Sequence, residues 1–139
     1  MKLRRLRRRK LTRYLIKSLI KEPIKNLEIT DKWISFEYDE EEVANEIIIK
    51  KHEHYVGSWA KTKNRVYIDD SLKGKKDIKA IALHESIEKL VAQKYGLGED
   101  TDAHIIATAK EKEFLEKIGG NWEKHQRIVT KVWKLEGEK

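Results

Sequence analysis

The sequence predicts an α+β fold: a small antiparallel sheet followed by three helices and preceded by a basic N-terminal helix. Three patterns predict it. Apolar residues recur at helical spacing over residues 1–22, alternate with polar residues between 24 and 70, and return to helical spacing from residue 77 onward. The chain has 139 residues, which is the length of one domain. We therefore expect an N-terminal helix and a single α+β domain over residues 24–139.

The N-terminal segment, MKLRRLRRRKLTRYLIKSLIKE, is expected to form a basic amphipathic helix over residues 1–22. Pro23 ends it, because the residue before a proline avoids the helical conformation. Residues 1–25 carry 11 Lys or Arg and one Glu, a net charge of +10, whereas the whole chain carries +7. The basic character therefore belongs to this helix, and the remainder is close to neutral. The residues expected to pack on the body are Leu11, Tyr14, Leu15 and Leu19.

The segment from Ile24 to Asp70 predicts three to five antiparallel strands. Its short runs are rich in β-branched and aromatic residues and are separated by charged or turn residues. These runs are LEIT, WISFEY, EIIIKK, YVGSWA and RVYID. Asn64 fits a hairpin turn before the last run. The first half of DEEEVANEIIIKK, residues 39–51, is ambiguous and also fits a helical turn.

Helical spacing then predicts three further helices, over residues 77–95, 102–118 and 122–135. Asp77 is the expected N-cap of the first, and Gly96 its stop. The second is expected to be capped by Thr101 or Asp102 and to end at the Gly119-Gly120 pair. The connection GLGEDT is short, so these two helices should pack antiparallel as neighbours.

Both of these helices carry a histidine and a glutamate on the face that should meet the core. At about 100° per residue, His84 and Glu88 lie one turn apart within the apolar arc of the first helix. His104 and Glu111 lie in the middle of the apolar side of the second. The polar arc of the first helix is expected to consist of Lys79, Ser86, Lys89 and Gln93.

These four buried polar residues predict a metal site. An unpaired buried carboxylate costs several kcal/mol, so such groups pair, shift their pKa or bind metal. The chain has no cysteine, and two imidazoles with carboxylates suit a divalent ion, zinc first and manganese or iron next. The expected ligands are His84, Glu88, His104 and Glu111. The alternative is a polar network without metal.

The stretch IALHESIEKL, residues 81–90, begins like the metallopeptidase motif H-E-x-x-H. With the strand before it and the helix after it, the chain from Trp59 to Ile118 resembles the zincin metallopeptidases of the gluzincin type, whose third ligand lies on the next helix. The resemblance implies His84 as the first ligand, Glu85 as the general base that activates water, and His104 or Glu111 as the third ligand.

The resemblance also implies a zincin-like domain over residues 24–139, with a peptide or protein as substrate. The strand in KNRVYIDDSL would align an extended peptide beside the active-site helix. Glu88 departs from the motif, because it stands where the second histidine belongs. Carboxylate ligation of zinc at about 2.0–2.2 Å is normal, but the anion lowers the charge of the site and should make the ion a weaker Lewis acid.

The basic helix suggests other functions. Its charge density gives salt-dependent affinity for nucleic acid through residues 1–13, and with its leucines it also suits an anionic membrane surface. The residues expected to contact phosphates are Arg4, Arg5, Arg7, Arg8, Arg9 and Lys10. The competing hypotheses are a metal-dependent hydrolase, a nucleic-acid-binding module whose His/Glu cluster is structural, and an interaction protein whose basic helix docks a partner.

The remaining expectations concern location and the other histidines. No apolar run approaches the roughly 18 residues of a membrane span, and the N-terminus lacks the apolar core of a signal peptide, so a cytoplasmic protein is expected. The abundance of lysine and glutamate is typical of heat-adapted proteins. His52 and His54 are expected to be solvated. His125 is expected at the core or its boundary, with a further ligand or a ligand's partner as the alternative.

Overall fold

The structure, a computed structural model, describes the backbone of residues 2–51 and 55–137 and, within them, the side chains from Leu11 to Leu135. The described chain folds into four helices and one five-stranded sheet, which confirms the α+β class. The elements are α1 (Lys2–Lys21), β1 (Lys25–Ile29), β2 (Trp33–Tyr38), β3 (Glu41–Lys50), β4 (Gly57–Trp59), β5 (Arg65–Asp69), α2 (Lys75–Tyr95), α3 (Asp102–Lys117) and α4 (Trp122–Gly137).

The sheet is mixed, with the strand order β1-β2-β3-β5-β4. Three pairings are antiparallel, but β3 and β5 run parallel from Glu46↔Arg65 to Lys50↔Asp69, so the expected all-antiparallel sheet is wrong at this pairing. After β3 the chain forms the edge strand β4, turns through the loop that contains Asn64, and inserts β5 between β4 and β3. β3 is extended from Glu41, so the helical alternative for this segment is also wrong.

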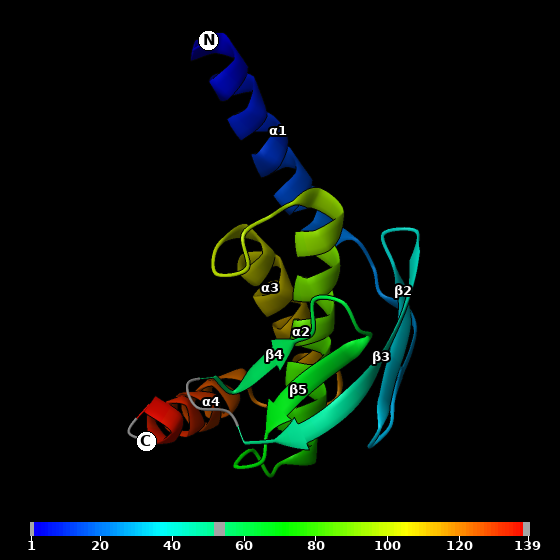
Figure 1. Cartoon of the computed structure of the whole chain (residues 1–139), viewed down its shortest axis with the longest axis vertical. Helices are drawn as coiled ribbons and strands as arrows, with labels where there is room; N and C mark the ends of the chain where they lie inside the picture. The colour runs from blue at the N-terminus through cyan, green and yellow to red at the C-terminus, as the bar shows by residue number, and fades with distance from the viewer. Residues whose placement is uncertain (1, 52–54, 138–139) are drawn as a thin grey trace.

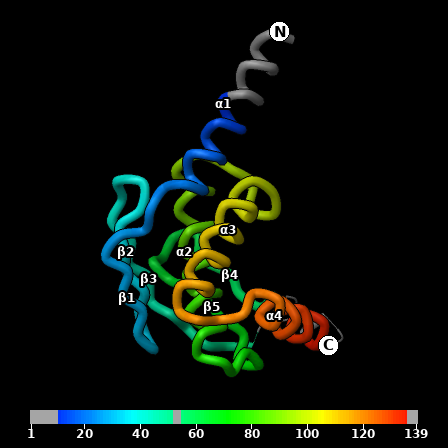
Figure 2. The backbone as a smooth tube through the Cα atoms, turned by 180° about the vertical axis from the view of Figure 1, so that it is seen from behind, coloured from blue at the N-terminus to red at the C-terminus, as the bar shows by residue number. Residues whose placement is uncertain are grey.

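The molecule has three layers: the sheet, then α2, then α3 (Figures 1 and 2). The inward side chains of the sheet, among them Ile34, Phe36, Val66 and Ile68, are buried in the core with those of α2. The central helix is buried on nearly all sides between Ala80 and Val91. Its expected polar arc is therefore not solvated throughout.

Two residues of that arc show that the sheet side of the molecule covers it. Ser86 is fully buried and accepts a hydrogen bond from the Asn45 side-chain amide at 3.1 Å, and Lys89 donates to the carbonyl of Ala60. The helical projection separated polar from apolar residues correctly. It could not show that the sheet would cover the polar side as well, because coverage depends on neighbouring elements.

Helix α2 ends where the sequence predicts it to end, but it does not begin where the sequence predicts. Gly96 adopts the left-handed conformation with φ 67°, as expected for a stop residue. The helix begins at Lys75 with Gly74 as its N-cap, so the assignment of Asp77 as N-cap is wrong. Asp77 lies in the first turn, where its carboxylate faces α4.

Helix α1 projects away from the body (Figure 1) and contacts it through its last turns. Leu19 is buried and Leu15 is partly buried, but Leu11 and Tyr14 are exposed, so only half of the expected packing stripe is correct. The reason is the direction of the helix, which carries its first turns beyond the sheet and α3. No helix in the described part of the chain combines the length and apolar character that a membrane span requires.

Candidate metal centre

The candidate metal centre lies between α2 and α3, which pack against each other more extensively than any other two elements. His84 and Glu88 come from α2 and His104 from α3, and one ligand atom from each lies within 4.8 Å of the others. The prediction that the two helices bring their polar residues together is confirmed for these three. His84 and Glu88 are buried, whereas the side chain of His104 is 54% exposed. The site is therefore open to solvent on the α3 side.

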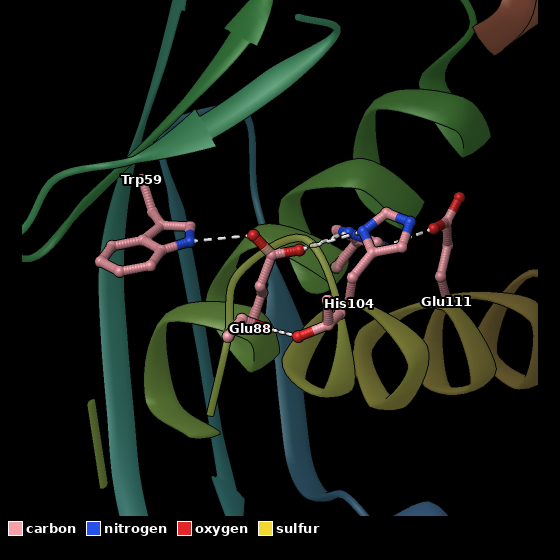
Figure 3. A network of polar contacts seen from close by, with 7 residues as sticks. Trp59, Glu88, His104 and Glu111 are labelled. Atoms are coloured by element: carbon pink, nitrogen blue, oxygen red, sulfur yellow. Dashed lines mark hydrogen bonds and ion pairs between the residues drawn. The ribbon is translucent and has the colours of Figure 1, made fainter. Parts of the chain in front are cut away.

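Glu88 lies at the centre of the group (Figure 3). Its Oε2 atom is 3.0 Å from His84 Nε2 and 3.2 Å from His104 Nδ1. Its Oε1 atom accepts a hydrogen bond of 3.1 Å from the indole N–H of Trp59 on β4. The two imidazoles meet edge to face, with ring centroids 4.8 Å apart. Ligand bonds near 2 Å place the donor atoms of one ion about 3–4 Å apart, so small side-chain shifts suffice for binding.

Glu111 lies outside this group of three and contacts the opposite side of His84. Its Oε1 atom is 2.7 Å from His84 Nδ1, and its Oε2 atom is 2.5 Å from His125 Nε2. His125 Nδ1 in turn lies 2.6 Å from Asp77 Oδ1. We call the sequence of contacts Asp77–His125–Glu111–His84 the polar chain. A carboxylate on the far nitrogen of a ligating histidine fixes its ring orientation and tautomer.

Hydrogen bonds within the polar chain favour the charged forms of His84 and Glu111. Burial lowers the pKa of His84, but its hydrogen bonds to Glu111 and Glu88 outweigh burial and raise that pKa to about 10. Burial raises the pKa of Glu111, but the hydrogen bonds to His125 and His84 outweigh it, so the pKa lies below its usual value. Burial also raises the pKa of Glu88, but its hydrogen bonds to His84, Trp59 and His104 outweigh burial. The pKa of Glu88 therefore also lies below its usual value. These buried groups therefore form charge-assisted pairs.

Glu85 is different, because it is buried without a charge partner of this kind. Its Oε2 atom has no hydrogen-bond partner among the described residues, and burial raises the pKa of its carboxyl to about 8. β4 packs closely over it at Gly57: a Cβ there would lie 3.0 Å from Glu85 Cγ and 2.8 Å from Ile81 Cγ2. Gly57 therefore allows the strand to approach the helix beside the candidate base.

A pocket of about 520 Å³ opens over these residues, between β4, α2, α3 and α4. Among the described residues that line it there are five carboxylates and no lysine or arginine, although the chain contains 31 of these basic residues. The carboxylates are Glu85, Glu88, Glu99, Asp100 and Glu111. Such a wall favours a bound cation and disfavours an anion.

The strand beside the pocket is β4 rather than the expected one. Within KNRVYIDDSL, Arg65–Asp69 form β5, which pairs with β3 on one side and β4 on the other. Its main-chain groups are therefore occupied and cannot align a substrate. β4 is the edge strand, and its residues Gly57, Ser58 and Trp59 line the pocket. The sequence correctly predicted a strand beside the helix. It could not predict that β5 would insert between β3 and β4 and leave β4 at the edge.

Two contributors to the site, Trp59 and Asp77, were not predicted from the sequence. Asp77 was expected as a helix cap, and Trp59 was named only as the start of the segment that resembles the zincins. His125 is buried, as expected, but its two carboxylate contacts join α4 to the metal centre. Its position near Val129 and Val132, on the apolar side of α4, could have indicated a role in the site. The same kind of position identified His104. His52 and His54 lie outside the described residues.

We predict that His125→Leu weakens binding of Zn²⁺ by about 10–100-fold, the usual effect of removing a partner of a ligand. Without the imidazole, Glu111 loses the contact that holds it against His84. Competition with a chromophoric chelator measures the affinity, and circular dichroism checks the fold. Lys124→Leu, at an exposed position of the same helix, is the control and should bind as the wild type does. Equal affinities of the two variants would contradict a role for the polar chain.

The candidate centre thus combines three side chains that could hold a metal ion, a carboxyl group with a raised pKa and an open pocket, all on one set of packed elements. Comparison of the chain with protein-family models, with curated proteins and with solved structures gave no match.

Proposed function

We propose that the protein is a zincin-like metal-dependent hydrolase that cleaves peptide bonds. His84, Glu88 and His104 are the ligands of a divalent ion, and Glu85 is the general base. The observation that carries the proposal is the position of Glu85. It follows a ligand directly in the sequence, it lines the same pocket as all three ligands, and its buried Oε2 atom has no partner among the described residues.

The donor set fits a catalytic rather than a structural ion. Two imidazoles and one carboxylate make three protein ligands, and catalytic zinc sites keep their fourth position open. A divalent ion held there supplies Lewis acidity and makes water more acidic. Zinc fits these donors best, and the carboxylate also suits manganese or iron. Trp59 and Glu111 support the proposal because they hydrogen-bond to Glu88 and His84 and would hold them in place.

The surrounding residues suit hydrolysis of an extended peptide. A carboxyl group with a pKa of about 8, as burial gives Glu85, accepts a proton from attacking water and donates it to the leaving amine efficiently at mildly alkaline pH. The outer edge of β4 pairs with no strand of the described chain, so its main-chain groups can bind a peptide as an added strand. No lysine or arginine in the described lining competes with the ion for the carboxylates.

The test is cleavage of a denatured protein by enzyme that has been stripped with a chelator and reloaded with Zn²⁺ or Mn²⁺. We expect cleavage only after reloading. Glu85→Gln should bind metal normally and cleave about 10²–10⁴ times more slowly, the usual contribution of a general base. Glu99→Gln, an exposed carboxylate of the same pocket, is the matched control. Equal cleavage by wild type and Glu85→Gln would exclude Glu85 as the base, and bound metal without cleavage would exclude the hydrolase.

A second candidate function is nucleic-acid binding through α1. It is favoured by the direction of this helix, which projects away from the body (Figure 1), and by the net charge of +10 over residues 1–25. The side chains of Arg4 to Lys10 lie outside the described side chains, so this proposal rests on sequence and helix direction. Affinity for duplex DNA should fall steeply with salt. Deletion of residues 1–10 should remove that affinity, and an unchanged affinity would contradict the proposal.

A further inference from the structure

The pocket has an apolar wall at the end formed by α4 and the residues before β4. Trp122, Val129 and Trp133 contribute to it from α4, and Tyr55 faces the same pocket. Trp133 is 56% exposed and Tyr55 is 60% exposed. Large apolar side chains that are left exposed in a concave site are the usual anchors of ligand binding. The buried side of α4, by contrast, carries His125 and Val132.

We propose that this wall is a subsite for one large apolar or aromatic side chain of the substrate. The proposal rests on the proposed function, since it names the class of peptide that the same centre accepts. It concerns binding, however, and can be tested without cleavage.

The wall adjoins the metal centre through a chain of direct contacts. The Trp122 ring lies 5.5 Å from the His125 ring, centroid to centroid. His125 contacts Glu111, which contacts the ligand His84. A substrate group that rests on Trp122 is therefore separated from the ligands by side chains that touch one another. One extended molecule can reach both places.

Strand β4 runs between the wall and the ligands, so a peptide that binds along β4 would extend from one to the other. Gly57 packs over Ile81 and Glu85, and Trp59 hydrogen-bonds to Glu88, so β4 follows α2 past the candidate base toward the ligands. Tyr55 lies two residues before Gly57, on the side away from Trp59. Successive residues of an extended chain are about 3.3 Å apart. A peptide that extends along β4 away from the ligands therefore runs toward Tyr55 and the apolar wall.

The charge of the pocket further restricts which substrate side chain the wall can bind. Five carboxyl groups line the pocket, against two histidines of raised pKa, His84 and His125, and no lysine or arginine among the described lining residues. The lining therefore disfavours an acidic side chain. The aromatic groups favour a flat or bulky apolar side chain, because stacking and edge contacts add to apolar burial. The preferred residue is therefore phenylalanine, tryptophan or leucine, and aspartate or glutamate is rejected.

The four tryptophans of the chain provide the test. Trp59, Trp122 and Trp133 line the pocket, whereas Trp33 is exposed on β2 and does not line it. ¹⁵N-labelled Glu85→Gln protein, metal-free and zinc-loaded, is titrated with acetyl-Gly-Phe-Gly-amide and with acetyl-Gly-Asp-Gly-amide. The phenylalanine peptide should shift the indole N–H signals of Trp122 and Trp133 and leave that of Trp33 unchanged. The aspartate peptide should shift none of them.

Two alanine variants identify the residue responsible. Trp133→Ala should weaken binding of the phenylalanine peptide about tenfold, as for an interface anchor. Trp33→Ala, which removes another half-exposed tryptophan, should leave the affinity unchanged. Equal shifts with both peptides, shifts that include Trp33 equally, or no shifts with the phenylalanine peptide would overturn the subsite.

The outcome is independent of the hydrolase proposal. Selective shifts in a protein that never cleaves peptides support the subsite and reject the hydrolase. Cleavage that is indifferent to the apolar residue, with no selective shifts, supports the hydrolase and rejects the subsite.

Discussion

His84→Ala is expected to abolish tight binding of a divalent ion and to lower the free energy of unfolding of the metal-free protein by about 3 kcal/mol. His84 contacts Glu88 through one ring nitrogen and Glu111 through the other, and all three are buried. Removing it leaves two buried carboxylates with one partner fewer each. Loss of a ligand's partner alone costs about 10–100-fold in metal affinity, so loss of this ligand should cost more than 100-fold.

His104→Ala is the matched control, because it separates metal binding from stability. His104 is also in the ligand group, but its side chain is 54% exposed, and it contacts Glu88 and the His84 ring at the rim of the site. We expect a similar loss of metal affinity with a change in stability of no more than about 0.5 kcal/mol. Urea denaturation and chelator competition measure the two quantities. Tight Zn²⁺ binding by either variant would show that the ion is held elsewhere.

Glu85→Gln is expected to stabilise the metal-free protein by about 3 kcal/mol at pH 7. Burial raises the pKa of this carboxyl from 4.5 to about 8 in the folded protein. Between these values the folded state keeps a proton that the unfolded state has released. Wild-type stability therefore falls as the pH rises through this window, whereas a glutamine at the same position causes no such loss.

The pH dependence makes this prediction specific. The stability difference between the variant and the wild type should grow from about pH 4.5 to about pH 8 and then stay constant. Denaturation curves at several pH values in the presence of a chelator measure it. Parallel stability curves for wild type and Glu85→Gln would mean that Glu85 is ionised in the folded protein.

Much of the site could be predicted because its geometry is local. The i, i+4 spacing puts His84 and Glu88 on one face of a helix, and a six-residue connection forces the next helix to return beside it. The position of His104 follows from these two facts. The same reasoning placed Glu111 on the correct face, but only the packed structure shows that it contacts His84 and His125.

The features that the sequence did not predict depend on long-range packing. Period-two alternation identifies strands but not the direction in which they pair, so the parallel pairing of β3 and β5 was missed. The burial of Ser86 and Lys89 depends on the sheet that covers them. The role of His125 depends on where α4 docks, and no local pattern in residues 118–122 determines that position.

The two edges of the sheet disfavour association of two copies through strand pairing. At one edge, β1 has a register shift between Lys25 and Glu28, with Asn26 at φ 53°. At the other, β4 is only three residues long. Irregular or very short edge strands are poor templates for edge-to-edge aggregation. β4 is thus long enough for a few main-chain hydrogen bonds to a bound peptide but too short to start the growth of a fibril.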